Sequence, residues 1–210
     1  RNVWEIPAYT KDYQPTSIIV KGIEKPIYQT ISHQGLHFHA RTNIEDAQKE
    51  IQTGLRLKQA GVSVARPIAY FIRGSEQYTY HEKVHGRDPR DVLRTDPAQL
   101  WKEDAKLLAN LLRNGAHHYR YACKDLDDRI WNNGSLTLID TDEMMWYEEL
   151  YSPKKGMWDA KKRRGFATER CVDATSTYLF YGVMDPEYVR EYTKHFLEAY
   201  DGNLQGLDAL

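Results

Sequence analysis

The chain has 210 residues, of which 41% are hydrophobic and 28% are charged, a composition typical of globular proteins rather than of disordered or fibrous ones. The 29 Lys and Arg residues are balanced by 30 Asp and Glu residues, so a nucleic-acid partner is not expected from overall charge. No apolar run approaches the roughly 18 residues that a transmembrane segment needs, and the N-terminal residues lack the apolar centre of a signal peptide. With only two cysteines, Cys123 and Cys171, the sequence has no disulfide framework, and the expected location is cytoplasmic.

The first third of the chain is predicted to form strands and one helix. Residues 17–21 are a β-branched run, and residues 27–31 alternate again after a turn, so these two runs predict a β-hairpin. A helix follows, with Thr42 or Asn43 as its cap and apolar residues at helical spacing. Gly61 is expected to end this helix.

Two further extended runs are expected to complete a small, mostly antiparallel sheet. They cover residues 66–72 and 77–84 and are joined by Gly74-Ser75. After residues 85–89, which are turn formers and charged residues, the sequence pattern changes from strand-like to helical. This change predicts an N-terminal sheet domain of residues 1–85 with one helix, and a mainly helical domain of residues 86–210.

The second domain is predicted to be helical, with one hairpin inside it. A helix begins at Asp96-Pro97, and another helical region covers residues 166–199. Between them, residues 129–131 and 135–140 flank the turn Asn132-Asn133-Gly134. Asn-Gly between β-rich runs is the strongest local hairpin signal, because both residues accept the positive φ angles of a type I′ turn. The fold class is therefore α+β.

Three short motifs, in their order along the chain, resemble the protein-kinase-like fold. Residues 136–142, LTLIDTD, look like the "LIDFD" that ends the second short strand in the RIO-type kinases and in the lipopolysaccharide core (Kdo and heptose, or InaA-like) kinases. Residues 50–67 are similar to their "E…L…L…aGv.vP" helix and loop, and residues 196–200 resemble the "rFL.aY" helix of the lipopolysaccharide branch. The matches span most of the chain. The resemblance implies a two-lobed kinase-like fold that binds ATP and Mg²⁺ in a cleft between the lobes.

The resemblance also implies roles for carboxylates in the second lobe. Asp140 follows the hairpin and is the candidate Mg²⁺ ligand, since a rigidly held carboxylate suits a metal that bridges nucleotide phosphates. Asp125 is the candidate that orients an acceptor hydroxyl, with Asp127 as the alternative. Asp128 is expected to replace the metal-binding Asn of the family. The competing interpretations are a charged surface loop and, for Asp140, a carboxylate that caps a turn.

In such kinases a lysine of the third strand pairs with a glutamate of the first helix and holds the α and β phosphates. Glu50 fits the helix position, and two alignments of the strands remain open. One makes Lys21 the phosphate lysine, and the other replaces the lysine by Gln29 or Thr30.

The adenine is expected against the hinge after the sheet, where the backbone of Glu82 and Val84 would read it. No glycine precedes Lys21, so a glycine-rich phosphate loop is missing there. The sequence therefore supports two hypotheses. The first is an ATP-dependent kinase acting on a sugar or protein hydroxyl, and the second is a pseudokinase that serves as a binding or scaffolding module. A basic stretch, residues 154–164, is more simply a solvated segment than a nucleic-acid contact.

Overall fold

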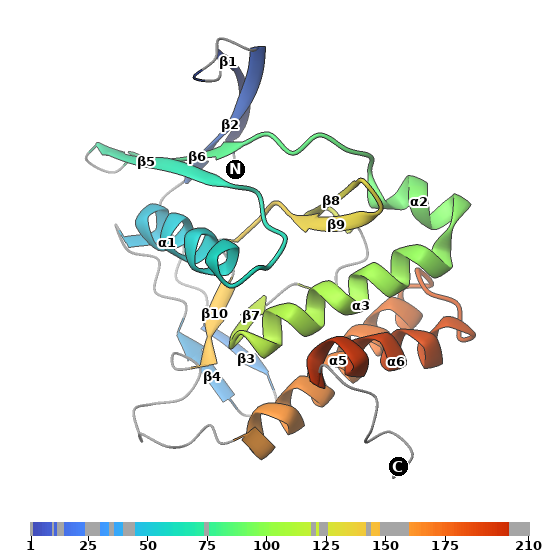
Figure 1. Ribbon diagram of the computed structural model, residues 1–210. Coiled ribbons are helices and arrows are strands. Elements are labelled where there is room, and N and C mark those ends of the chain that lie inside the picture. The colour runs from blue at the N-terminus through green and yellow to red at the C-terminus, as the bar shows by residue number, and fades with distance from the viewer. Residues whose placement is uncertain are drawn as a thin grey trace. The chain divides into compact units, whose positions relative to one another are not determined.

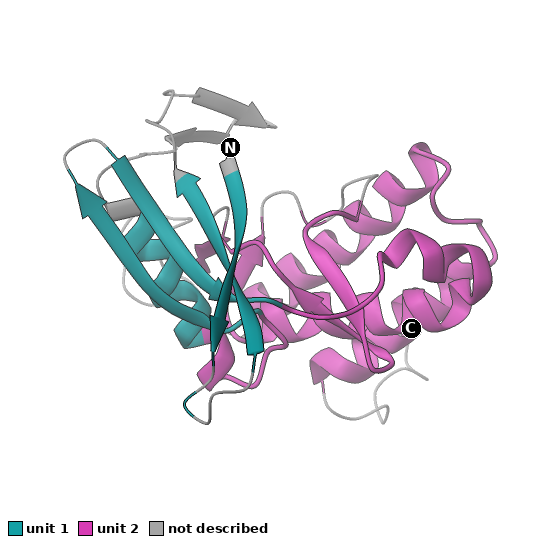
Figure 2. Cartoon of the chain, turned by 90° about the horizontal axis from the view of Figure 1, so that it is seen from above, with its two compact units in different colours: residues 1–56, 65–83 teal, residues 57–64, 84–210 magenta. Residues whose placement is uncertain are grey.

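The chain folds as two compact units with α+β architecture. The computed structural model describes residues 2–9, 11, 15–23, 30–33, 36–39, 45–73, 76–118, 121, 126–141, 144–147 and 160–201. Figure 2 colours unit 1, residues 1–56 and 65–83, in teal and unit 2, residues 57–64 and 84–210, in magenta. The expected division after residue 85 lies near the start of the long segment of unit 2, and the structure also assigns residues 57–64 to that unit. Of the described helices, none has the length and hydropathy needed to cross a bilayer.

Unit 1 is built on a four-stranded antiparallel sheet with the strand order β1-β2-β6-β5 (Figure 1). Its strands are β1 (Asn2–Tyr9), β2 (Pro15–Ile23), β5 (Pro67–Arg73) and β6 (Glu76–Glu82). A separate hairpin is formed by β3 (Thr30–His33) and β4 (Leu36–His39). The predicted antiparallel pair β5 and β6 is confirmed.

The predicted hairpin between residues 17–21 and 27–31 is wrong. β2 pairs with β1 on one side and with β6 on the other, so no edge of β2 is left for a third partner. Residues 30 and 31 pair within the β3 and β4 hairpin instead, and residues 27–29 lie outside the described part. β1 was not predicted from the sequence; it contains Pro7, and a proline is compatible with an edge strand.

The helix of unit 1 is α1 (Glu45–Gln59), as the spacing of apolar residues predicts. Ala47 and Ile51 are buried one helical turn apart, whereas Leu55, one turn further along the same face, is exposed. Gly61 ends the helix with a φ of 78°, a left-handed conformation that glycine adopts without strain. The predicted end of the helix is thus confirmed, whereas the candidate caps at positions 42 and 43 lie outside the described residues.

Unit 2 is mainly helical. Its described helices are α2 (Pro89–Thr95), α3 (Pro97–Arg113), α5 (Ala160–Phe180) and α6 (Tyr188–Asp201). Its strands form two antiparallel pairs, β7 (Ala116–His118) with β10 (Met144–Trp146), and β8 (Arg129–Asn132) with β9 (Ser135–Leu138). α3 packs against both α5 and α6, and its buried side chains form the centre of the hydrophobic core (Figure 1). Asp96 caps α3 through a hydrogen bond from Gln99 N, which confirms the predicted start of this helix.

The hairpin of β8 and β9 forms as its turn sequence predicts. Asn133 and Gly134 have φ angles of 49° and 81°, the positive values that a type I′ turn requires at both central residues. The first strand of this hairpin is also tied to the chain before α2, because Arg87 and Trp131 exchange two backbone hydrogen bonds of 2.8 and 3.0 Å. β8 is therefore hydrogen-bonded on both sides, to β9 and to Arg87.

Gly86 allows this close approach, and replacing it should be costly. A methyl group on Gly86 would lie 2.2 Å from the carbonyl oxygen of Trp131, which is backbone and cannot rotate away. We expect Gly86→Ala to lower the free energy of unfolding by about 1–3 kcal/mol. Gly165→Ala is the matched control, because a methyl group at this helical position meets no atom within 4 Å and should stabilise the protein by about 0.5–1 kcal/mol. Urea unfolding of both variants measures the difference, and effects of equal sign would contradict it.

Candidate functional site

A buried ion pair joins the sheet of unit 1 to its helix. Nζ of Lys21, on β2, lies 3.2 Å from Oε1 of Glu50, on α1. Only 7% of Lys21 and 1% of Glu50 are exposed. The structure thus brings together the two residues of the first alignment. In the second alignment, Gln29 lies outside the described residues and Thr30 belongs to β3.

Two residues of β6 complete the surroundings of Glu50. Thr79 lies opposite Lys21 in the sheet and donates a hydrogen bond of 3.3 Å from Oγ1 to Glu50 Oε2. His81 lies opposite Ile19, and its Nε2 is 3.2 Å from Glu50 Oε1. Both side chains are buried. The carboxylate of Glu50 is therefore contacted by a lysine, a hydroxyl and an imidazole.

Sequence reasoning missed Thr79 and His81, although β6 carries a signal for them. Gln77, Thr79 and His81 occupy alternate positions of the strand and are all buried. Alternate residues of a strand point to one face, and a face of three polar side chains needs polar partners when it is covered. Gln77 finds one as well, since its Oε1 accepts a hydrogen bond of 3.2 Å from Ala47 N. A buried polar face opposite the helix could have been inferred from this pattern.

The predicted hinge residues lie at the end of β6. The Glu82 side chain is exposed and forms an ion pair of 2.8 Å with Arg66, while its backbone N–H donates to the Arg66 carbonyl. Val84 is half-buried. The backbone N–H of Lys83, between them, donates to the carbonyl of Ser17. The backbone N–H groups of residues 82 and 83 are thus both donors in hydrogen bonds within unit 1.

Asp140, the predicted metal ligand, lies two residues beyond the end of β9. It is half-buried, and the residue before it is tied to the predicted catalytic loop, because Ile139 N donates a hydrogen bond of 2.8 Å to the carbonyl oxygen of Asp128. The backbone segments of Asp140 and Asp128 are therefore neighbours within unit 2. Burial lowers the pKa of His118, and the charges of both aspartates act in the opposite direction.

The carboxylate of Asp128 has a protein partner. Its Oδ1 accepts a hydrogen bond of 2.7 Å from Arg129 Nε, and its Oδ2 accepts one of 3.3 Å from Arg129 Nη2. His118 Nδ1 is 3.8 Å from Oδ2. Asp128 is buried, with 7% of its surface exposed. A metal role for Asp128 stays a prediction, and it would require this carboxylate to share its oxygens with Arg129.

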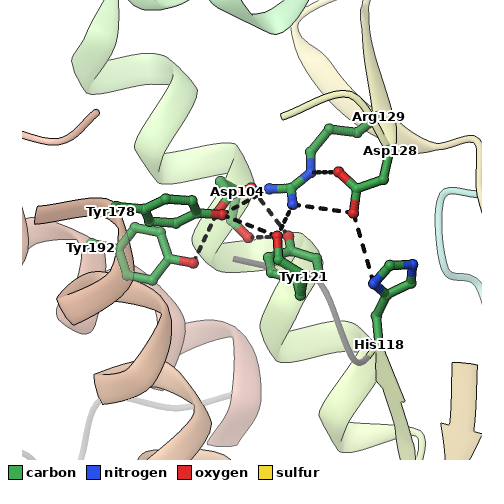
Figure 3. Close-up of polar contacts among 7 residues, drawn as sticks. All are labelled: Asp104, His118, Tyr121, Asp128, Arg129, Tyr178 and Tyr192. Atoms are coloured by element: carbon green, nitrogen blue, oxygen red, sulfur yellow. Dashed lines mark hydrogen bonds and ion pairs between the residues drawn. The ribbon is translucent and has the colours of Figure 1, made fainter. Parts of the chain in front are cut away.

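Arg129 belongs to a larger buried network around Asp104, a residue of α3 (Figure 3). Arg129 Nη1 forms an ion pair with Asp104 Oδ1 and also donates to the Tyr178 hydroxyl. Tyr178 and Tyr192 donate hydrogen bonds of 3.1 and 2.8 Å to Asp104 Oδ2. The Tyr121 hydroxyl lies 2.9 Å from the Asp104 backbone carbonyl oxygen and 3.2 Å from the carboxylate oxygen Oδ1, and it can donate to either. Side chains from α3, α5, α6, β8 and residue 121 thus meet on one carboxylate.

Burial dominates the electrostatics of this network. It raises the pKa of Asp104, while the Arg129 charge and the Tyr192 hydrogen bond act in the opposite direction. The Asp104 and Asp128 charges hold the pKa of Arg129 well above its usual value despite the desolvation that opposes it. Because Asp104 receives Arg129 and tyrosine hydroxyls, we regard it as ionised at neutral pH. Sequence reasoning missed this network, since its members are far apart in the chain and match no motif.

The remaining candidates are only partly described. Asp125 lies outside the described residues, and Asp127 is exposed. Within the described part, no three His, Cys, Asp or Glu side chains gather in a way that could hold a metal ion. In the basic stretch, residues 161–164 are exposed at the start of α5, and residues 154 and 155 lie outside the described ranges. The candidate residues whose surroundings the structure describes best are therefore Lys21 and Glu50 in unit 1 and Asp140 in unit 2.

Two buried histidines of β7, His117 and His118, should make the stability of the protein depend on pH. Burial lowers the pKa of His117 to about 3 from its ordinary 6.5, and burial also lowers the pKa of His118. As the pH falls below about 6.5, both histidines bind protons in the unfolded chain before they do so in the folded state, so the folded state loses stability; for His117 this loss continues to about pH 3, by up to about 1.4 kcal/mol per pH unit.

Replacing His117 should flatten this dependence. We expect His117→Gln to lose less free energy of unfolding between pH 7 and 5 than the wild type loses, whereas the exposed His85→Gln should follow the wild type. Urea unfolding at three pH values measures the slopes. Equal slopes for the wild type and His117→Gln would contradict the expectation.

Comparison with known proteins does not assign the chain to a family. A scan of the sequence against protein-family models gives no match, and a search of curated proteins gives none either.

Proposed function

We propose that the protein is an ATP- and Mg²⁺-dependent kinase that transfers a phosphoryl group to a hydroxyl of a sugar or a protein. In this proposal Lys21 holds the nucleotide phosphates and Glu50 orients Lys21. Asp140 is a Mg²⁺ ligand, and Asp125 orients the acceptor hydroxyl.

The observation that carries the proposal is the buried pair of Lys21 and Glu50. Burying two opposite charges costs desolvation free energy that their attraction repays only in part, so such a pair is a poor way to stabilise a fold. Its use in a kinase is to hold a lysine in one orientation for the phosphates. The resemblance expects the lysine on the third strand and the glutamate on the first helix; Lys21 lies on β2, and Glu50 lies on α1.

The position of Asp140 gives further support. A Mg²⁺ ion that bridges phosphates needs a carboxylate that does not move. Asp140 follows a hairpin whose turn has the type I′ signature and whose outgoing strand is bonded to Asp128. This rigid base suits a metal ligand better than a carboxylate on an exposed loop.

Thermal unfolding with and without Mg·ATP tests the proposal first. At 100 times its dissociation constant, a nucleotide should stabilise the native state by about 2.7 kcal/mol. Asp140→Ala should reduce this stabilisation strongly when Mg²⁺ is present, while Asp173→Ala, on helix α5, where the carboxylate pairs with Arg170, should leave it unchanged. The absence of any shift with wild-type protein would refute a nucleotide site of this kind.

A second test separates a kinase from a pseudokinase. The pseudokinase alternative is favoured by one observation: the chain has no glycine before Lys21, so the connection between β1 and β2 lacks the residue type that lets backbone amides approach phosphates. Release or transfer of labelled γ-phosphate, measured with Asp125→Ala as the comparison, decides between them. Stabilisation by Mg·ATP without any turnover would support the binding module.

A further inference from the structure

Helix α5 of unit 2 has one face in the core and the opposite face in solvent. The inner face is buried in the hydrophobic core through Ala167, Cys171, Ala174 and Tyr178. We define the outer face of α5 as residues 169, 172, 176, 179 and 180, which recur at helical spacing on the other side and are all exposed. A helix that covers a core in this way normally carries polar residues on its solvent side.

The outer face of α5 is largely apolar toward its C-terminal end. Val172 is 55% exposed, Leu179 is 36% exposed and Phe180 is 83% exposed. The Phe180 ring also contacts the ring of the next residue, Tyr181, with centroids 5.2 Å apart, and Tyr181 is itself 54% exposed. Exposed apolar side chains that gather on one surface mark a place where a partner binds.

The charges along α5 oppose its helix dipole. Residues 161–164, Lys-Lys-Arg-Arg, are exposed at the N-terminal end, where unpaired backbone N–H groups already create a positive potential. The last turn carries no basic residue at the negative end, and the exposed Asp185 and Glu187 follow it. Arg164 pairs with Asp201 of its own chain at 2.8 Å, which compensates one of the four cations. The surface of α5 is thus positive at one end and negative at the other, with the apolar side chains between them.

We propose that the outer face of α5 is the interface of a homodimer, in which two copies of the chain pack antiparallel about a two-fold axis at Val172. The positive end of each α5 then lies against the negative end of the partner helix, so charges and helix dipoles are both complementary. Arg164 and Phe180 are equally far from Val172 in the sequence. The cations of one copy therefore come close to the partner's Phe180, and cations are attracted to the faces of aromatic rings.

A second copy fits this surface better than a membrane or a nucleic acid does. Both of these polyanions would attract residues 161–164. The same polyanion would repel Asp185 and Glu187, which follow the apolar side chains by a few positions. A copy of this chain offers the opposite charge at each end at once, together with the apolar area that Val172 and Phe180 need.

Sedimentation equilibrium of the full chain at pH 7 and low salt tests the dimer. We expect a reversible equilibrium between one chain and two. Val172→Glu places two carboxylates at the axis and should raise the dissociation constant at least about tenfold. Leu55→Glu is the matched control, because Leu55 is a helical residue of α1 with 44% exposure, and it should change the constant less than about twofold. A wild type that stays a single chain at every concentration would overturn the proposal, as would a dimer that Val172→Glu leaves intact.

Charge reversal tests the antiparallel orientation. Lys161→Glu and Asp185→Lys should each weaken the dimer, because each places like charges opposite one another. The double variant should recover much of the lost affinity, and high salt should reduce the differences among these proteins. Losses that simply add in the double variant would overturn the orientation. Assemblies that grow beyond two chains would overturn it as well, since a two-fold contact closes on itself.

Discussion

Replacing Arg129 with methionine is expected to lower the free energy of unfolding by about 3–5 kcal/mol. Arg129 is 1% exposed and is the cation that compensates Asp104 and Asp128, both of which are buried. Methionine keeps much of the side-chain volume but leaves two carboxylates without their countercharge and the Tyr121 carbonyl without its donor. A loss of this size is a large part of the stability of an ordinary domain.

Urea unfolding at pH 7 measures this loss, and two variants serve as controls. Arg94→Met removes an arginine whose side chain is 77% exposed and whose ion pair with Asp91 lies on the surface, so it should change stability by less than about 0.5 kcal/mol. Tyr192→Phe removes one hydrogen bond to Asp104 and should cost about 1–2 kcal/mol. If Arg129→Met were no worse than Tyr192→Phe, the charge balance of the network would not be what stabilises it.

Under the proposed kinase function, replacing Lys21 with methionine is expected to reduce phosphoryl transfer by roughly 100-fold to 1,000-fold, as the loss of one preorganised charge at a transition state does. Glu50→Gln should reduce transfer in the same direction, since a neutral amide orients Lys21 less firmly. The reason is the geometry of the pair, in which Nζ and Oε1 are 3.2 Å apart in a buried setting. Transfer of labelled γ-phosphate at saturating Mg·ATP is the measurement.

Lys83→Met is the matched control for Lys21→Met. Lys83 belongs to the same unit and also pairs with a glutamate, Glu5 at 2.8 Å, but its side chain is 32% exposed and its partner 47%. We therefore expect transfer to fall less than about twofold. Circular dichroism of each variant verifies that it is folded. Full transfer by folded Lys21→Met would contradict the assigned role, and equal losses in both variants would show that the assay responds to surface charge.

The fold was predictable where a local pattern decides it. The type I′ turn at Asn133 and Gly134, the cap at Asp96 and the end of α1 before Gly61 each depend on a few adjacent residues. The partner of β2 was not predictable in this way. Strand pairing depends on which segments come together in the fold. A proline such as Pro7 is a poor strand former, and β1 tolerates it because β1 is an edge strand.

The candidate site was predictable only in part, for the same reason. The Lys21 and Glu50 pair was one of two alternatives that the kinase-like resemblance left open, and the structure brings these two residues together. Thr79 and His81 contact Glu50 because of the register in which β6 pairs with β2, and local sequence patterns do not determine this register. Asp104 and Arg129 could not be paired from sequence, because 25 residues separate them and an aspartate within a helix gives no local sign that it is buried.

The anchoring of residues 121 and 129 has a consequence for how this protein can change. The Tyr121 carbonyl accepts a hydrogen bond from Arg129 Nη2, the Arg129 guanidinium lies over the Tyr121 ring at 4.1 Å, and both residues are attached to Asp104. Because the contacts of Tyr121, Arg129 and Asp104 depend on one another, substitutions at these three positions should show coupled effects on stability instead of additive ones.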